Sequence, residues 1–204
     1  KNYMIKVFAD HHENHKSFDE KVSFSIERIG GIKFLRKYRK VQLINESIKE
    51  NRIEGLIADH WKSLELIKTN KKKICLIHGK EINHEKGTNL NKRVLSVLNN
   101  VEIVVANSQY TKELAIKCGV TEDRITVINP GVELVQDLDK KIINKVEILL
   151  KHKSPRLITV SRFDKRKNHE KIIMALRNLK QIYPSIIYIC TGYGNEEQNI
   201  KKLV

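Results

Sequence analysis

Short apolar runs alternate with longer amphipathic stretches along most of the chain. The short runs are rich in β-branched residues, which predicts strands at residues 56–58, 74–77, 103–106, 125–128, 157–160 and 186–190. In the longer stretches apolar residues recur three or four positions apart, which predicts helices at residues 90–98, 109–118 and 168–182. Because buried strands that alternate with helices form parallel sheets covered on both faces, the pattern predicts an α/β fold.

The N-terminal part adds two predicted strands, at residues 3–9 and 21–27, and one long helix at residues 32–51. One stripe of this helix is apolar and is expected to be buried; it consists of Leu35, Tyr38, Val41, Ile44 and Ile48. The basic residues at 36–40 lie on the other faces. We expect those faces to be solvated, since Phe34 is the one bulky aromatic residue expected to be exposed there.

Residues 134–154 interrupt the alternation with a charged segment that ends in Lys-His-Lys-Ser-Pro. A new strand then restarts the series, so we predict two α/β units. The first comprises residues 1–134, the second comprises residues 155–204, and residues 135–154 form the linker between them. The second unit contains two predicted strands, which is few for an independent sheet, so we expect it to be truncated.

Composition narrows the class of protein. Of the 204 residues, 40% are hydrophobic and 31% are charged, which is typical of a folded globular chain and excludes wholesale disorder. No apolar run approaches the ~18–20 residues of a membrane-spanning helix. The three cysteines, Cys75, Cys118 and Cys190, are too far apart for a Cys-x-x-Cys motif, and their odd number indicates a reducing compartment. The sequence therefore predicts a cytoplasmic protein.

The charge balance leaves several partners open. Lys and Arg number 39 against 24 Asp and Glu, a formal net charge of +15, which suits nucleic acid, an anionic membrane or a phosphorylated substrate. The lysines are spread over the whole length, which favours a solvated basic surface. Aromatic residues make up 6% of the chain and offer little surface for base stacking. A nucleic-acid-binding module therefore stays an alternative, and we expect no specific nucleic acid partner.

Polar residues that could bind a ligand lie where predicted strands end. The segment Val-Ser-Arg-Phe-Asp-Lys-Arg-Lys-Asn-His at 160–169 joins a strand to a helix, and such loops lie at the ligand-binding edge of a parallel sheet. Arg162 and Lys167 there could bind an anion without a metal; the alternative is a solvated charged loop. Gly192 and Gly194, in the next strand-to-helix turn, would let the backbone approach a ligand closely.

Two segments of the chain contain histidines that could have a chemical role. His78, in the segment His-Gly-Lys-Glu at 78–81, follows another predicted strand and is either a structural or a catalytic residue. Residues 10–15 include three histidines and two acids, which are metal-ligand types. They precede no helical stripe that would bring them together, so a solvated loop is the favoured interpretation and no metal site is expected.

Five motifs occur in an order that resembles a known family. They are His-Gly-Lys-Glu at 78–81, Ala-Asn-Ser at 106–108, Ile-Asn-Pro-Gly-Val-Glu at 128–133, Val-Ser-Arg through Lys-Asn at 160–168, and Thr-Gly-Tyr-Gly at 191–194. In order and spacing, from about Leu56 to Val204, they resemble retaining glycosyltransferases of family 4. The resemblance implies the glycosyltransferase-B fold, which has two Rossmann-like domains, and places the acceptor-side domain first and the nucleotide-sugar-binding domain second.

The resemblance also implies roles for particular residues. Arg162 and Lys167 match the basic pair that binds the donor diphosphate, and His78 matches the catalytic-site histidine beside the transferred sugar. Four further positions match loops of the donor nucleotide and the cleft: Gly192, Gly194, Asn129 and Gly131. The donor is a nucleotide-sugar bound as substrate, and neither a cofactor nor a metal is expected.

Two family features are missing from these residues. The first unit lacks the opening strand with its Gly-rich loop, and the chain ends before a pair of glutamates that contact the sugar and the ribose. We therefore expect both domains to be incomplete and the 204 residues alone to be inactive. Sugar transfer to a glycan, lipid or small-molecule acceptor is the leading prediction, with polysaccharide biosynthesis as its setting. A nucleotide-sugar epimerase of the same fold and an inactive relative stay open, as does a peripheral contact with the inner face of the membrane.

Overall fold

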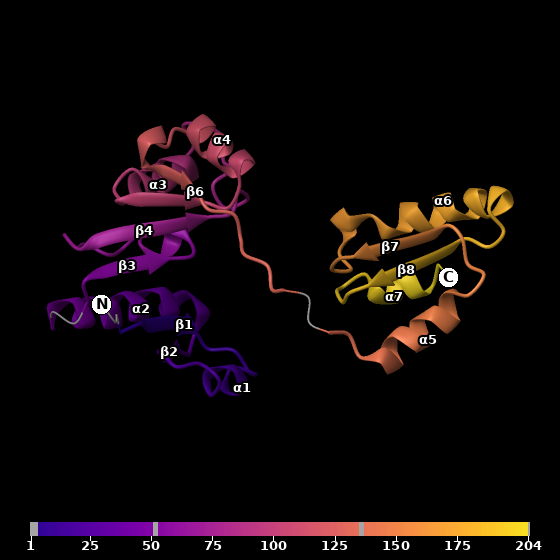
Figure 1. Cartoon of the computed structure of the whole chain (residues 1–204). Coiled ribbons are helices and arrows are strands. Elements are labelled where there is room, and N and C mark those ends of the chain that lie inside the picture. The colour runs from indigo at the N-terminus through magenta and orange to yellow at the C-terminus, as the bar shows by residue number, and fades with distance from the viewer. Residues whose placement is uncertain (1–3, 51–52, 135–136, 204) are drawn as a thin grey trace. The chain divides into compact units, whose positions relative to one another are not determined.

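A computed structural model describes residues 4–50, 53–134 and 137–203 (Figure 1). The chain divides into two compact units, Lys1–Val132 and Glu133–Val204. Each unit has its own sheets and its own cluster of buried apolar side chains. Strands run parallel wherever they pair, so the fold class is the α/β fold expected from the alternating pattern.

A four-stranded parallel sheet forms the centre of the first unit. Its strands follow one another in chain order: β3 (Gly55–Ala58), β4 (Lys72–Ile77), β5 (Ile103–Ala106) and β6 (Ile125–Val127). Helix α3 (Asn89–Leu98) connects β4 to β5, and α4 (Gln109–Cys118) connects β5 to β6. Because crossovers between parallel strands are right-handed, successive connections in this order lie on the same face of the sheet.

Local sequence signals explain where α3 and α4 begin and end. Thr88 caps α3 by accepting a hydrogen bond from the Asn91 N–H, and Ser108 caps α4 in the same way. Gly119 ends α4 in the left-handed conformation, at φ +106°, which glycine adopts without steric cost. Helix α3 buries Val94 and Leu98 in the core of this unit, and α4 buries Ala115 there. Burial in this core raises the pKa of Cys75 to about 12, so the thiol stays neutral.

The N-terminal strands form a separate parallel pair, β1 (Lys6–Asp10) and β2 (Ser25–Ile29), followed by α2 (Lys33–Lys49). The second strand begins four residues later than the pattern predicted. The prediction that Tyr38 is buried is also wrong, because its side chain is 59% exposed. Val41, Ile44 and Ile48 of the same stripe do join the core, so α2 makes its core contacts through its C-terminal half.

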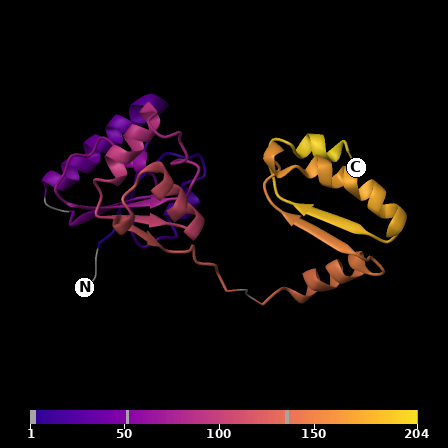
Figure 2. The same ribbon diagram turned by 90° about the horizontal axis from the view of Figure 1, so that it is seen from above.

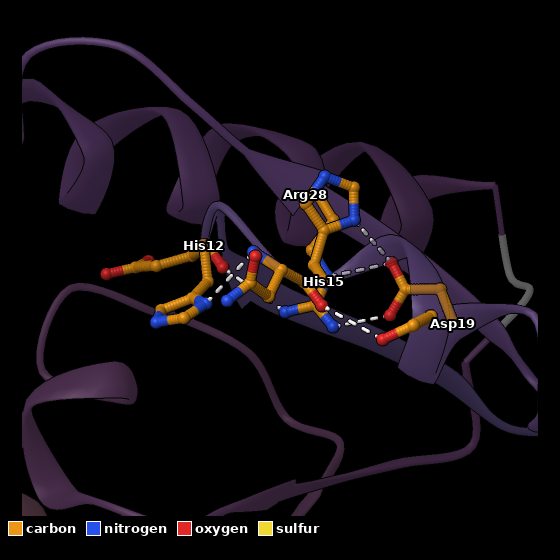
Figure 3. Close-up of polar contacts among 7 residues, drawn as sticks. His12, His15, Asp19 and Arg28 are labelled. Atoms are coloured by element: carbon orange, nitrogen blue, oxygen red, sulfur yellow. Dashed lines mark hydrogen bonds and ion pairs between the residues drawn. The ribbon is translucent and has the colours of Figure 1, made fainter.

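A polar cluster ties the β1–β2 connection together (Figure 3). The Asp19 carboxylate, at the end of the short α1 (Lys16–Asp19), lies between two partners. His15 Nδ1 is 2.9 Å from one carboxylate oxygen, and Arg28 on β2 binds both oxygens through two guanidinium nitrogens. These contacts hold the pKa of Asp19 at about 2. Within the part of the chain that the structure describes, no three His, Cys, Asp or Glu side chains are grouped to bind a metal ion.

Glu65 makes a second ionic junction, between helices. Its carboxylate accepts two hydrogen bonds from Arg93 on α3, at 2.6 and 3.1 Å, and one from Lys37 on α2 at 3.0 Å. A bidentate arginine pair is among the stronger charge-assisted contacts. Together the two cations lower the pKa of Glu65 from 4.5 to about 2.

This junction predicts acid sensitivity of the first unit. Because the folded state binds the Glu65 proton more weakly than the unfolded state, its contribution to stability is complete above about pH 4.5 and disappears as the pH falls towards 2. Trp61, the one tryptophan of the chain, is buried in this unit and can report its unfolding. We expect Glu65→Gln to lower the urea midpoint of the Trp61 transition at pH 7 and to flatten its decrease below pH 4.5. Glu54→Gln, at an exposed position, is the control; equal shifts in both variants would contradict the assignment.

From Arg156 onwards the second unit is a β–α–β–α segment. Strands β7 (Arg156–Val160) and β8 (Ile187–Thr191) pair in parallel, and helices α6 (His169–Ile182) and α7 (Glu197–Lys201) lie on the same side of them (Figure 2). The core on that side is built around three buried residues, Phe163, Ile173 and Ile200. On the other side Ile158 and Val160 are exposed.

The expected linker at 135–154 contains a helix, α5 (Lys140–Leu150). Asp139 caps it by accepting a hydrogen bond from the Lys141 N–H. Ile142, Val146 and Leu149 recur at helical spacing, a signal that the surrounding charged residues obscured in the sequence. None of the described helices is both long enough and apolar enough to cross a membrane.

Candidate functional site

The basic loop of the second unit begins where β7 ends. Ser161 to Asp164 leave the strand, Lys165–Lys167 make one 3-10 turn, and Asn168 takes the left-handed conformation, at φ 59°, before α6 starts. Asn is one of the few residues that tolerate this conformation. The turn therefore brings Arg162 and Lys167 onto one loop at the carboxyl edge of the sheet, as the sequence predicted for a loop of this kind.

The cations on this loop have different surroundings. Arg162 and Arg166 both pair with the half-buried Asp164, at 3.7 and 3.3 Å, and both side chains are 63% exposed. Lys167 is exposed and lies beside Lys171 on α6, at the rim of a hollow of about 340 Å³ between α6 and Leu157. One carboxylate thus faces two guanidinium groups, which leaves the loop with a net positive charge.

The glycine turn after β8 packs directly against this basic loop. The Phe163 N–H donates to the Tyr193 carbonyl at 2.9 Å, and the Glu196 N–H donates back to the Phe163 carbonyl at 3.0 Å. Gly192 and Gly194 have φ +150° and +156°. A Cβ at Gly192 would lie 1.9 Å from the Ser161 carbonyl oxygen, so the missing side chain makes room for the basic loop itself. The sequence assigned these glycines to a ligand, and the structure adds this internal role.

His78 follows β4 at the carboxyl edge of the first unit's sheet, and its side chain is exposed. Glu81 fixes the backbone around it. Its Oε1 accepts hydrogen bonds from the N–H groups of both His78 and Gly79, and its carbonyl accepts one from Trp61 Nε1 at 2.9 Å. The fourth residue of the His-Gly-Lys-Glu motif is therefore a positioning residue, a role that the motif alone did not reveal.

The structure adds Asp59 and His60 to this edge. They directly follow β3, which pairs with β4, and His78 directly follows β4. Burial and the nearby Lys62 lower the pKa of His60, which favours a neutral imidazole at pH 7. The sequence signal for these residues is the segment Asp-His-Trp directly after a short apolar run.

The remaining predicted residues follow β5 and β6 at the same edge. Asn107 and Ser108 serve the local fold: the Asn107 Oδ1 accepts a hydrogen bond from the Thr111 hydroxyl at 2.7 Å. Asn129 and Gly131 are exposed, and a Cβ at Gly131 would meet nothing within 4 Å. Each unit therefore presents its own set of candidate residues at the carboxyl ends of its strands. His78, Asn129 and Gly131 belong to the first unit, and Arg162, Lys167, Gly192 and Gly194 belong to the second.

Solved structures share this architecture. HepE from Anabaena, crystallised with UDP, matches with a TM-score of 0.68 and 17% identity, over 98% of this chain and 64% of that chain. A glycosyltransferase from Rickettsia africae matches with a TM-score of 0.64 and 16% identity, over 99% and 65%. A TarM mutant from S. aureus, crystallised with UDP, gives 0.58 and 15%, over 82% and 34%. The chain thus spans less than two thirds of the length of these structures, and the likeness shows the glycosyltransferase-B fold.

Family comparisons identify both units. No curated protein matches the sequence. The family model described as Glycosyltransferase Family 4 matches residues 5–136, and the model described as Glycosyl transferases group 1 matches residues 140–204. The two matches lie in the order of the two units and confirm the resemblance carried by the five motifs. The chain therefore belongs to glycosyltransferase family 4, with its second unit in the glycosyl transferases group 1.

Proposed function

We propose that the protein to which these residues belong transfers a sugar from a nucleotide-sugar donor to an acceptor and retains the anomeric configuration. The observation that carries this proposal is the packing of the basic loop at 161–168 against the glycine turn at 191–196. It gathers several cations and a glycine turn at one sheet edge, where a nucleoside diphosphate can bind. HepE was crystallised with UDP and with UDP-glucose, which supports a uridine diphosphate sugar as the donor.

The group that most needs stabilisation during the reaction is the departing diphosphate. When the bond between the anomeric carbon and the diphosphate oxygen breaks, negative charge develops on the departing diphosphate. Arg162 and Lys167 would stabilise that charge, and because it grows in the transition state, the stabilisation accelerates the reaction. Since these side chains supply positive charge themselves, we propose that transfer needs no added metal or cofactor and proceeds in the presence of a chelator.

The other residues that match family positions would contact the sugar and the nucleotide or lie in the loop that leaves the first domain. His78 would lie beside the transferred sugar and position the reacting centre, with Glu81 fixing its backbone. Gly192 and Gly194 would line the nucleotide, and Asn129 and Gly131 would lie in the loop that leaves the first domain. The acceptor is a glycan, a lipid or a small molecule.

Nucleotide binding tests this function directly. We expect calorimetry on the chain to show that UDP binds about ten- to a hundredfold more tightly than UMP, because the second phosphate adds charge-assisted hydrogen bonds of ~1.5–3 kcal/mol. Uridine should bind more weakly still, and EDTA should leave the UDP affinity unchanged. Equal affinities for UDP and uridine would contradict a diphosphate site. A matching affinity for a generic oligonucleotide that falls steeply with salt would favour the nucleic-acid alternative.

Two expectations accompany this test. We propose that the 204 residues alone do not turn over a donor, which an assay with UDP-sugars in the presence and absence of a candidate acceptor checks. Detection of released UDP at an enzymatic rate would contradict it. Conversion of the donor to its epimer, without transfer, would favour the epimerase alternative.

Helix α2 supports a peripheral membrane contact. Phe34 and Tyr38, one helical turn apart, are 69% and 59% exposed, so the expectation that Phe34 is the one exposed aromatic there is wrong. Arg36 and Arg39 beside them donate hydrogen bonds to the carbonyl oxygens of Gly31 and Gly30. Aromatic side chains flanked by cations are suited to an anionic lipid surface, where each Lys or Arg contributes ~1 kcal/mol. We propose an anionic bilayer as the occupant of this surface.

Vesicle binding checks the membrane contact. We expect the chain to sediment with phosphatidylglycerol-containing vesicles and to remain in solution with neutral phosphatidylcholine vesicles. Replacing both Phe34 and Tyr38 by Ser should weaken the binding at least tenfold, because two interfacial rings are lost. The matched control is Tyr110→Ser on α4, a side chain 70% exposed. Equal losses in the control and the double variant would contradict an α2 surface.

A further inference from the structure

His169 is a buried polar residue that the proposed reaction does not use. It is the first residue of α6, and it is 3% exposed. The left-handed Asn168 before it turns the chain so that the imidazole points back under the basic loop, towards the end of β7. Burying an imidazole destabilises the fold unless its ring nitrogens are hydrogen-bonded. The partners of those nitrogens therefore indicate which segments His169 holds in place.

Both ring nitrogens have hydroxyl partners, one just after β7 and one on β8. Nε2 lies 3.1 Å from the Ser161 hydroxyl at the end of β7, and Nδ1 lies 3.3 Å from the Tyr188 hydroxyl on β8. A neutral imidazole offers one donor and one acceptor, and a hydroxyl can take either part, so both contacts are satisfied in either tautomer. The ring therefore connects the end of β7, the start of α6 and the middle of β8.

The same ring also supports the residue on the other side of Arg162. Phe163 packs edge-on against His169, with ring centroids 5.2 Å apart and an interplanar angle of 89°. The Phe163 backbone is in turn held by Tyr193 and Glu196 of the glycine turn. Ser161 and Phe163, the two neighbours of Arg162, are thus both anchored on His169, while the Arg162 side chain between them stays exposed.

We infer that His169 is a positioning residue for Arg162, acting through Ser161 and Phe163. An exposed arginine loses side-chain entropy when it binds an anion, and a mobile backbone would add a further loss. Because the Ser161–Phe163 segment is already fixed, the entropy lost when Arg162 binds an anion is smaller. This inference rests on the proposed diphosphate site, since it assigns His169 the task of holding the cation that faces the diphosphate. Tyr188 completes the arrangement by fixing the plane of the ring.

The test measures UDP affinity and melting temperature of the chain side by side. We expect Ser161→Ala and His169→Asn each to weaken UDP binding about tenfold, as expected for one lost hydrogen bond of a positioned group. The double variant should bind as His169→Asn alone does, because the Ser161–His169 contact is already lost in that variant. His169→Gln should restore most of the affinity, since its amide reaches the place of Nε2. Tyr188→Phe should weaken binding, and the matched Tyr183→Phe, at an exposed position outside these contacts, should not.

The Arg162→Ala background separates positioning from mere structural support. There, Ser161→Ala and His169→Asn should leave UDP affinity unchanged, because the group that they position is gone. The same two changes would still lower the melting temperature if they weakened the fold. Unchanged UDP affinity in the single variants, beside weakened binding by Arg162→Ala, would overturn the inference alone. Unchanged affinity in Arg162→Ala itself would overturn the proposed diphosphate site, and this inference with it.

Discussion

Replacing Arg162 by alanine is expected to lower the turnover of sugar transfer about 100- to 1000-fold in the full-length enzyme. The change removes fixed charge stabilisation of the departing diphosphate, which for comparable preorganised groups amounts to roughly 3–4 kcal/mol. The fold should survive, because Arg162 is exposed and its ion pair with Asp164 spans 3.7 Å at the surface. Steady-state kinetics with a nucleotide-sugar donor, together with a melting curve, measures both effects. Lys167→Ala should behave in the same way.

The chain offers a closely matched control for this prediction. Arg166 carries the same charge on the same loop, pairs with the same Asp164 and has the same 63% exposed side chain as Arg162. We expect Arg166→Ala and Lys165→Ala to retain most of the turnover, since neither position matches a family contact. Equal losses in all four variants would show that the loop acts as a generic cationic surface. Near-normal turnover in Arg162→Ala and Lys167→Ala would place the diphosphate elsewhere and end the mechanism proposed here.

Hydrophobic periodicity predicted the helices well where capping residues mark their ends and few charged residues interrupt the apolar stripe. The helix expected at residues 109–118 has those bounds in the structure, because Ser108 caps one end and Gly119 the other. The helix at 140–150 was missed because its apolar stripe is set among lysines and an acidic segment, so charge obscured periodicity. Tyr38 was misplaced for a different reason. Sequence spacing fixes the face of a helix, but the length over which that face meets a sheet is a tertiary property.

The candidate sites were predictable in part, because strand ends are local features of the sequence. Arg162, Lys167, Gly192 and Gly194 lie where parallel strands end, and the topology of such sheets brings those ends to one edge. The contact between His169 and Tyr188 was not predictable in the same way. It joins residues 19 positions apart on different elements, and its formation depends on the register of β7 against β8. Spacing rules carry no information about such a contact.

The packing of the glycine turn makes a second strong prediction. Gly192→Ala is expected to destabilise the second unit by about 2–6 kcal/mol, the sum of backbone strain of ~1–3 kcal/mol and an overpacking cost of ~1–3 kcal/mol. The new Cβ would lie 1.9 Å from the Ser161 carbonyl oxygen, and φ +150° disfavours any L side chain. Gly194→Ala should be similar, since its Cβ would lie 2.3 Å from the Phe163 carbonyl oxygen. In both variants the basic loop must move away from the turn.

Two spectroscopic transitions distinguish this local effect from general damage. Trp61 lies in the first unit, so its fluorescence should report an unchanged transition in Gly192→Ala, while the far-ultraviolet circular dichroism signal of the second unit is lost at lower temperature. Gly30→Ala is the matched control, because its Cβ would approach no atom closer than 4.0 Å. We also expect Gly192→Ala to lose UDP binding at temperatures where its second unit is still folded. The new Cβ displaces Ser161, and Arg162, the next residue, is displaced with it. Normal stability with normal UDP binding in Gly192→Ala would mean that the turn and the basic loop do not form one packed edge, and that these glycines serve neither the fold nor the donor.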